Sequence, residues 1–307
     1  MNRAALKDIV SIVVRLTVTC LLAGAVMGAT FVLTHEAKAR NEQARDERVL
    51  YAILGYGDNR PQNMALHTVY RYVLAREDAS SIGYVVPVGD GAQSVVMEVD
   101  LDGHFVQHFE LLADSARLRN DGDRDRAVIA ALNAGIHAQG ESTIQARYAD
   151  KFIIATQNGR RNAYILDGKY PGFKTFIRVK MALDEKFSLM GFEVLEHEED
   201  PGLGAEITQP WFRNQFAGKS YEQIKKLQVT RSPVPDPWMD VLSGKITGSE
   251  AQTIRQQHAD DDIYALTGAT ISSRSVLQGN QAMIRKFVTR MEILDRVLKE
   301  QHIETPF

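Results

Sequence analysis

The apolar run near the N-terminus restricts what this chain can fold into more than any other segment. Residues 9–33 read IVSIVVRLTVTCLLAGAVMGATFVL, with Arg15 as the only charge, and the 18 residues from Leu16 to Leu33 carry none. Together with residues 9–14, this stretch is long enough to cross about 30 Å of hydrocarbon as a helix. Arg15 lies near one end, where its long side chain reaches the lipid headgroups. The sequence therefore predicts a transmembrane helix within residues 1–34, preceded by a short cytoplasmic tail.

A cleaved signal peptide is the alternative, because small residues occupy positions 23, 24, 25 and 29. The length of the run and the segment that follows it favour an anchor. Residues 35–54 are rich in Ala, Glu and Arg, and Gly55 and Gly57 end the pattern, which predicts a helical stalk. Arg3 and Lys7 in the short tail favour a cytoplasmic N-terminus, with the bulk of the chain outside the cytoplasm.

Charge and cysteine content exclude several classes of protein. The first 34 residues carry three basic residues and one acid, a charge of +2, which leaves −5 for the rest of a chain whose net charge is −3. That balance argues against a nucleic-acid partner. Cys20, in the apolar run, is the only cysteine, so the chain contains no internal disulfide, thiolate zinc site or cysteine-ligated iron–sulfur cluster.

Period-2 and period-3.6 patterns alternate in the remainder and predict a mixed α+β fold, an antiparallel sheet with packed helices. We expect helices at 64–76, 123–133 and 271–299, and strands at 84–88, 94–101, 105–111, 173–183 and 187–195. The three prolines of 231–238 predict an extended crossing, followed by a loop rich in Gly and Ser. We divide the chain into 1–34, a stalk at 35–80, an α/β part at 81–170 and a C-terminal domain at 171–307. The similarity of LDGHFVQHFELL at Leu101 to LDEKFSLMGFEVL at Leu183 leaves an internal duplication open.

The segment Thr267-Gly268-Ala269-Thr270 opens the predicted terminal helix. A helix start offers free N–H groups and the positive end of the helix dipole, which together bind phosphate. The alternative is a threonine that only caps the helix after a glycine turn. Upstream, residues 197–204 read HEEDPGLG, and the glycines of this tight loop allow backbone to approach a ligand closely.

The two motifs together resemble the covalent-FMN domain of ion-translocating membrane oxidoreductases, the RnfG/NqrC family, whose members belong to the Rnf complex and to the sodium-pumping NADH:quinone reductase. The resemblance covers residues 172 to about 288 and the N-terminal span. It implies that FMN is joined through a phosphoester to Thr270, with Thr267, Gly268 and Ala269 completing the motif. It also implies a flavin-proximal loop formed by His197, Glu199, Pro201, Gly202, Leu203 and Gly204.

The sequence departs from the family pattern at two positions. The family has Asp three residues before the first Ser/Thr of the motif, where this chain has Tyr264, and Asp260, Asp261 and Asp262 are the nearest acids. We expect Asp262 to assist recognition by the flavin transferase more than Asp260. Asp200 stands where the family usually has Thr.

Other candidate residues favour structural roles. His104 and His108 share a strand face without a convincing carboxylate, so we predict no metal site, and we identify no general base or nucleophile. Trp211, Phe212 and Phe216 have helical spacing, which is more typical of a core than of flavin stacking.

The resemblance implies an electron-transfer component of a Rnf-type complex, in which electron transfer between ferredoxin and NAD is coupled to ion transport. It would have no substrate turnover of its own, and would sit in the bacterial inner membrane with one span and an extracytoplasmic domain. Its partners would be the other membrane subunits and, during maturation, the flavin transferase. The alternatives are the corresponding component of the quinone reductase and a membrane-tethered sensor that binds a phosphorylated ligand noncovalently.

Overall fold

The computed structural model describes residues 3–57, 59, 61–76, 79–111, 118, 121–139 and 144–307, without the side chains of 3–10, 32–33, 35–40, 42–43 and 135–139. Residues 1 and 2 of the predicted tail lie outside these ranges. The chain separates into two compact units, Met1–Val49 and Leu50–Phe307.

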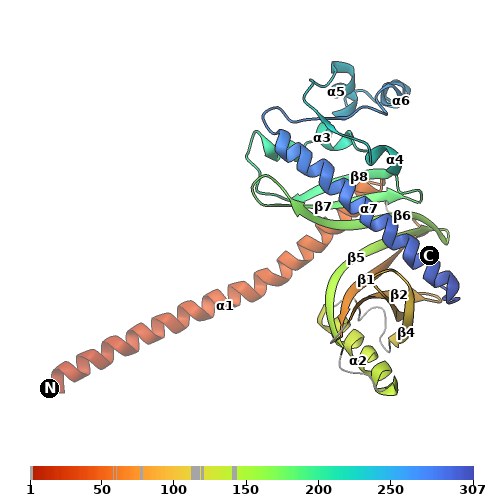
Figure 1. Ribbon diagram of the computed structural model, residues 1–307. Helices are drawn as coiled ribbons and strands as arrows, with labels where there is room; N and C mark the ends of the chain where they lie inside the picture. Colours follow the sequence, from red (N-terminus) through yellow and green to blue (C-terminus); the bar gives the residue numbers. More distant parts are fainter. Residues whose placement is uncertain are drawn as a thin grey trace. The chain divides into compact units, whose positions relative to one another are not determined.

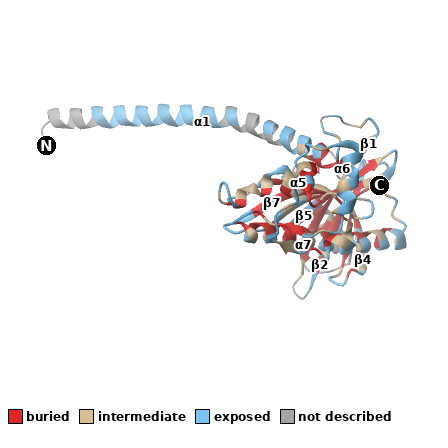
Figure 2. Ribbon diagram, turned by 90° about the horizontal axis from the view of Figure 1, so that it is seen from above, coloured by how far each residue is buried: buried red, intermediate tan, exposed pale blue. Residues whose placement is uncertain are grey.

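Helix α1 (Arg3–Ile53) contains both the predicted span and the predicted stalk. Within it, Ser11–Phe31 is long and apolar enough to cross a membrane, with a mean hydropathy of 2.0 and no buried residue; Figure 2 shows this stretch as exposed. The hydroxyls of Thr17, Thr19 and Thr30 donate to carbonyls four residues earlier at 2.8–2.9 Å, so these polar groups need no water. The helix ends at Ile53, and Gly55 and Gly57 then have φ of 82° and 57°, which confirms the predicted stop.

The second unit is built on one antiparallel sheet of eight strands, in the order β4-β3-β2-β1-β5-β6-β7-β8 (Figure 1). The strands are β1 (Met64–Ala75), β2 (Ser80–Val88), β3 (Gln93–Val99), β4 (Phe105–Leu111), β5 (Gln145–Gln157), β6 (Arg160–Pro171), β7 (Phe176–Asp184) and β8 (Leu189–Glu196). Two four-stranded meanders thus join along β1 and β5. The two similar sequence stretches begin in the turn before β4 and at the end of β7, and they continue into β4 and β8, the last strand of each meander. This arrangement agrees with an internal duplication, which stays a prediction.

Helices cover the sheet from both sides. The long helix α7 (Thr270–Glu300) crosses the strands and buries one face of itself in the main core, with Ile284, Phe287 and Met291 among its inward residues (Figure 1). Helix α2 (Asp121–Gln139) covers the opposite face of the first meander through Val128 and Leu132. Shorter elements connect β8 to α7: η2 (Gly204–Thr208), α3 (Pro210–Asn214), α4 (Tyr221–Ile224), α5 (Asp236–Leu242), α6 (Gly248–Gln257) and the parallel pair β9 (Val229–Thr230) and β10 (Ile263–Tyr264).

The predicted α+β class, the strands at 84–111 and 173–195 and the two helices at 123–133 and 271–299 are confirmed. The predicted helix at 64–76 is wrong, because this segment forms β1. Tyr70, Tyr72 and Leu74 pack under α2 while Val69 faces the other core. A strand buried on both faces loses the polar-apolar alternation that marks a strand, and its apolar residues then match a helical face.

Three further differences concern segments 144–171, 231–238 and 248–257. Strands β5 and β6 were not predicted, although Asn158 and Gly159 (φ 52° and 74°) form the tight turn that Asn-Gly favours. The prolines of 231–238 do not keep the segment extended throughout, since α5 begins at Asp236 with Pro237 in its first turn, where a missing N–H costs nothing. Helix α6 lies inside the predicted loop. The boundaries at 34, 80 and 170 stay predictions, although β1 lies within the predicted stalk and the sheet runs across the last two.

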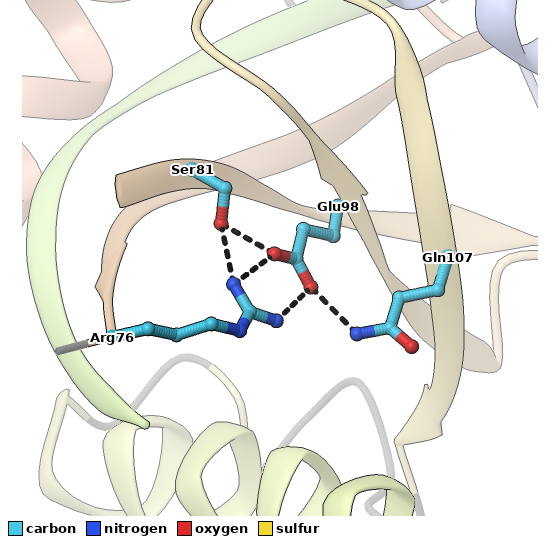
Figure 3. Close-up of polar contacts among 4 residues, drawn as sticks. All are labelled: Arg76, Ser81, Glu98 and Gln107. Carbon is cyan, nitrogen blue, oxygen red and sulfur yellow. Dashed lines mark hydrogen bonds and ion pairs between the residues drawn. The ribbon is translucent and has the colours of Figure 1, made fainter. Parts of the chain in front are cut away.

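A buried ion pair closes the end of the first meander (Figure 3). Glu98 is fully buried and accepts from Arg76 at 2.5 and 2.9 Å, from Gln107 at 2.9 Å and from the Ser81 hydroxyl. Burial by itself raises the pKa of Glu98, but these hydrogen bonds outweigh it and the net pKa lies below the ordinary value. The cluster therefore holds a charged carboxylate inside the sheet.

Candidate cofactor site at the start of helix α7

The two motifs singled out in the sequence meet at one cavity of about 460 Å³. Six of the ten predicted site residues line it: Glu199, Leu203, Gly204, Gly268, Ala269 and Thr270. His197, Pro201, Gly202 and Thr267 do not. The other lining residues, which sequence reasoning missed, are Phe173, Asp200, Arg231, Ile271 and Ser272.

Helix α7 begins at this cavity without a side-chain cap. Ala269 is the N-cap residue (φ −128°, ψ 43°), Thr270 is the first helical residue, and no described side chain accepts a hydrogen bond as a cap there. The alternative of a purely capping threonine is therefore wrong. The first N–H groups of α7 stay available to an anion, and the helix dipole favours negative charge at this point.

A glycine and a buried serine fix the turn before the helix. Gly268 has φ 75°, and a Cβ there would lie 3.0 Å from the Cδ2 atom of Leu203, so the 197–204 loop approaches this backbone closely. The fully buried Ser273 hydroxyl accepts from the Leu266 N–H at 3.0 Å and donates to the Ala269 carbonyl at 3.0 Å. These bonds hold the helix start and its approach in one conformation.

Glu199 joins the loop to the helix. Its carboxylate accepts from the Phe173 N–H at 2.7 Å, from the Lys174 N–H at 3.3 Å and from the Ser272 hydroxyl. Glu199 and Ser272 are 5% and 3% exposed, so water does not easily replace the bond between them. A Cβ at Gly204 would lie 2.6 Å from the Ser272 Oγ atom, which explains the glycine. Glu199 thus contributes to the site mainly by positioning its parts.

The remaining loop residues shape the backbone. The His197 Nδ1 atom accepts from the Glu199 N–H at 3.2 Å, and Gly202 has φ 72° in the turn that follows. Asp200 forms an ion pair with Lys174 beside the cavity. Arg231 is the one cation among the lining residues.

The cavity opens between apolar side chains. Phe173, Leu203 and Ile271 line it and are 56%, 45% and 56% exposed. An uncapped helix start, the Thr270 side chain at its first position and an apolar rim suit a ligand with a phosphate at one end and an apolar ring at the other. FMN has this chemistry, so the residues present fit it.

The position where the family has Asp is structural in this chain. Tyr264 is 9% exposed, lies in β10, and donates from its hydroxyl to Asp261 at 2.7 Å. Burial and the Asp261 carboxylate raise the pKa of Tyr264 to about 12. Asp261 is therefore the acid beside position 264, whereas the Asp262 carboxylate accepts from the Gln228 N–H at 2.8 Å.

Two of the weaker candidates are also placed. Phe212 and Phe216 are fully buried in the main core, where Phe216 packs against both Phe212 and Phe192, which confirms the structural interpretation. Asp100 and Asp102 do bring carboxylates next to His104, with ligand atoms within 4.8 Å of one another. The His104 side chain is 71% exposed, and exposed acidic groups of this kind are common without an ion.

Comparison with known proteins identifies the class to which this site belongs. Residues 172–285 match the family model of the FMN-binding domain, and this range contains every residue that lines the cavity. The chain therefore carries an FMN-binding domain, and the resemblance read from its two motifs is confirmed.

Similar proteins include subunits of ion-translocating oxidoreductases. The chain is 24% identical to the G subunit of the proton-translocating ferredoxin:NAD(+) oxidoreductase complex of Clostridium ljungdahlii over 44% of this chain and 59% of that protein. It is 31% identical to the G subunit of the ion-translocating oxidoreductase complex of Vibrio parahaemolyticus over 41% and 49%. The first three relatives are matched over 59%, 38% and 66% of their lengths, less than two thirds of each.

Among solved structures, NqrC of Shewanella oneidensis is 18% identical over 47% of this chain and 58% of that one, with a TM-score of 0.33. A likeness of this size carries no conclusion.

Proposed function

We propose that this protein is the FMN-carrying electron-transfer subunit of a membrane ion-translocating oxidoreductase of the Rnf type, with FMN linked through a phosphoester to Thr270. The observation that carries the proposal is the position of Thr270 at the first turn of an uncapped helix, on the wall of a cavity lined by both motifs.

The chain's own residues bind and orient the cofactor. The first N–H groups of α7 would hold the phosphate, and Arg231, which directly follows β9, would add a positive charge on the cavity wall. Glu199 and Ser273 keep the loop and the helix start in register. Phe173, Leu203 and Ile271 would cover part of the ring and exclude water. When bound, FMN supplies one-electron transfer.

Attachment to Thr270 requires FAD and a flavin transferase. The Thr270 Oγ1–phosphorus bond forms as the pyrophosphate bond of FAD breaks, AMP leaves, and the hydroxyl proton is released to solvent. The covalent link would prevent loss of the cofactor from a domain that faces a dilute compartment. The extracytoplasmic domain, the single membrane span and the other membrane subunits as partners are parts of the same proposal, and so is coupling to electron transfer between ferredoxin and NAD.

The test is flavin attachment to the full chain co-expressed with the transferase. We expect a fluorescent band after denaturing electrophoresis and an intact mass raised by one FMN. Thr270→Ala should lose both, whereas Thr289→Ala, an exposed threonine further along α7 that does not line the cavity, should retain them. Fluorescence that persists in Thr270→Ala contradicts the linkage. A flavin that co-purifies but is lost on denaturation would favour the noncovalent alternative.

A further inference from the structure

A second cavity, of about 420 Å³, lies between the middle of α7 and strands β5, β6 and β7. Its α7 residues, 283–290, follow Thr270 by 13 to 20 positions, which corresponds to about 20–30 Å along the helix. It shares no lining residue with the cofactor site. The proposed FMN-dependent function makes no use of it.

Positive charge dominates its wall. Five cations line the cavity (Lys151, Lys169, Arg178, Lys286 and Arg290) against two carboxylates, Asp150 and Asp167. Asp167 is already paired with Lys180 at 2.6 Å, and Arg178 with Glu196 at 2.5 Å. Among the described residues, none of Lys151, Lys169 and Lys286 has a carboxylate partner.

Behind the lysines, two arginines share one carboxylate. Arg71 binds both oxygens of Asp150 at 3.0 and 2.9 Å, and Arg290 approaches the Oδ2 atom at 3.1 Å. The Arg71 side chain is 9% exposed, and its Nε atom is buried without a partner. Burial and the neighbouring Arg71 lower the pKa of Arg290. Two cations thus share one carboxylate, and one of them, Arg71, is largely removed from water, so an anion that approaches the pair is favoured.

A β-bulge creates this arrangement. Arg71 pairs with Asp150 and Tyr72 with Tyr148, so Ala149 is the extra residue in β5. Asp150 is thereby directed to the side of α7, while Tyr148 contacts Tyr72 with ring centroids 5.8 Å apart. Bulges of this kind re-aim side chains and are enriched next to binding sites.

The cavity also has an apolar side. Phe152, Leu166 and Phe287 line it and belong to the main core. Its volume lies within the range of small-molecule pockets, about 300–1,000 Å³. We propose that this cavity binds a small organic anion, with a phosphate or carboxylate group held by Lys286, Lys169 and Arg290 and an apolar body against Phe152 and Phe287.

The probe for the test is 1-naphthyl phosphate, titrated by calorimetry into the full chain in phosphatidylcholine nanodiscs. The protein is prepared without flavin transferase, so the result does not depend on FMN attachment. We expect Lys286→Gln and Lys169→Gln each to weaken binding about tenfold, as one charge lost near the ligand would do. Neither lysine has a described ion-pair partner, and the Phe176 ring that Lys169 contacts at 4.5 Å belongs to an exposed side chain, so neither variant should disturb folding. The matched control is Arg285→Gln, the exposed neighbour on α7 that does not line the cavity, and it should leave the affinity unchanged.

Two comparison ligands test the two halves of the proposal. 1-Naphthol, without the anion, and inorganic phosphate, without the apolar body, should both bind more weakly than 1-naphthyl phosphate. Equal affinity of the wild type, Lys286→Gln and Lys169→Gln would overturn the proposal, and so would equal binding of 1-naphthol or of inorganic phosphate. A second titration in nanodiscs that contain phosphatidylglycerol identifies the source of the anion. Weaker binding of 1-naphthyl phosphate there indicates that the lipid headgroup competes for the cavity, and an unchanged affinity for the probe indicates a soluble ligand.

Discussion

Replacing Glu199 with alanine should destabilise the cofactor domain far more than replacing it with glutamine. Alanine removes the acceptor for the Phe173 and Lys174 N–H groups and for the Ser272 hydroxyl. The two N–H groups belong to exposed residues that water reaches, whereas Ser272 is 3% exposed and stays unsatisfied. Leaving a buried polar group without a partner costs about 1–3 kcal/mol, and a hydrogen bond to a charged group contributes about 1.5–3 kcal/mol. We expect a loss of about 3 kcal/mol in the free energy of unfolding.

Glutamine keeps an oxygen for the Phe173 N–H, and its amide donates to the Ser272 hydroxyl, so we expect a loss of about 1 kcal/mol or less. The assay is urea denaturation of the full chain in detergent, followed by the fluorescence of Trp211 and Trp238, the only tryptophans. A double-mutant cycle supplies the control. Ser272→Ala should cost less in the Glu199→Ala background than in the wild type, because its partner is already gone. Equal losses for alanine and glutamine, or strict additivity with Ser272→Ala, would refute this account of the carboxylate.

The remaining predictions concern the ion pair in the first meander, flavin attachment and topology. Glu98→Gln should lower the free energy of unfolding by about 2–3 kcal/mol at neutral pH, and Gln107→Ala by about 1 kcal/mol, both measured by urea denaturation. The folded-state pKa of Glu98 lies below the ordinary 4.5, so the stability that its charge contributes is complete above pH 4.5 and is lost as the pH falls through the lowered pKa. The loss of unfolding free energy in Glu98→Gln should therefore shrink on acidification. A loss that stays constant with pH contradicts this. Asp261→Ala should slow the gain of in-gel flavin fluorescence more than Asp262→Ala, because the former carboxylate contacts the tyrosine at the position where the family has Asp, and equal rates would show that neither acid matters. Alkaline phosphatase fused after Leu54 should be active, and an inactive fusion beside an active cytoplasmic reporter would reverse the proposed topology.

Local patterns accounted for much of this fold. The terminal helix carried its core face at helical spacing, and β4 alternated because one of its faces meets solvent. The glycines at 55 and 57 marked the end of α1 because they adopt positive φ at low cost. The prediction of a helix at 64–76 was wrong because this strand is buried on both faces, which removes the alternation that identifies a strand. The Asn158-Gly159 turn did carry a local signal for β5 and β6.

The candidate site was also predicted only in part from the sequence. Thr267–Thr270 and residues 197–204 were recognisable as motifs, because a helix start and a glycine loop are local backbone features with a fixed chemistry. Their meeting at one cavity, the Glu199–Ser272 bond and the place of Phe173 and Arg231 on the wall depend on how β6, β7, the 197–204 loop and α7 pack.

The sequence by itself determined the membrane-length apolar helix, the α+β class and the position of the start of α7, because length, periodicity and helix-end chemistry act over a few neighbouring residues. Only the tertiary structure decided the strand order and the basic cavity beneath α7. Arg71, Asp150 and Arg290 come from three segments far apart in the chain, and their charges interact only because packing places them together.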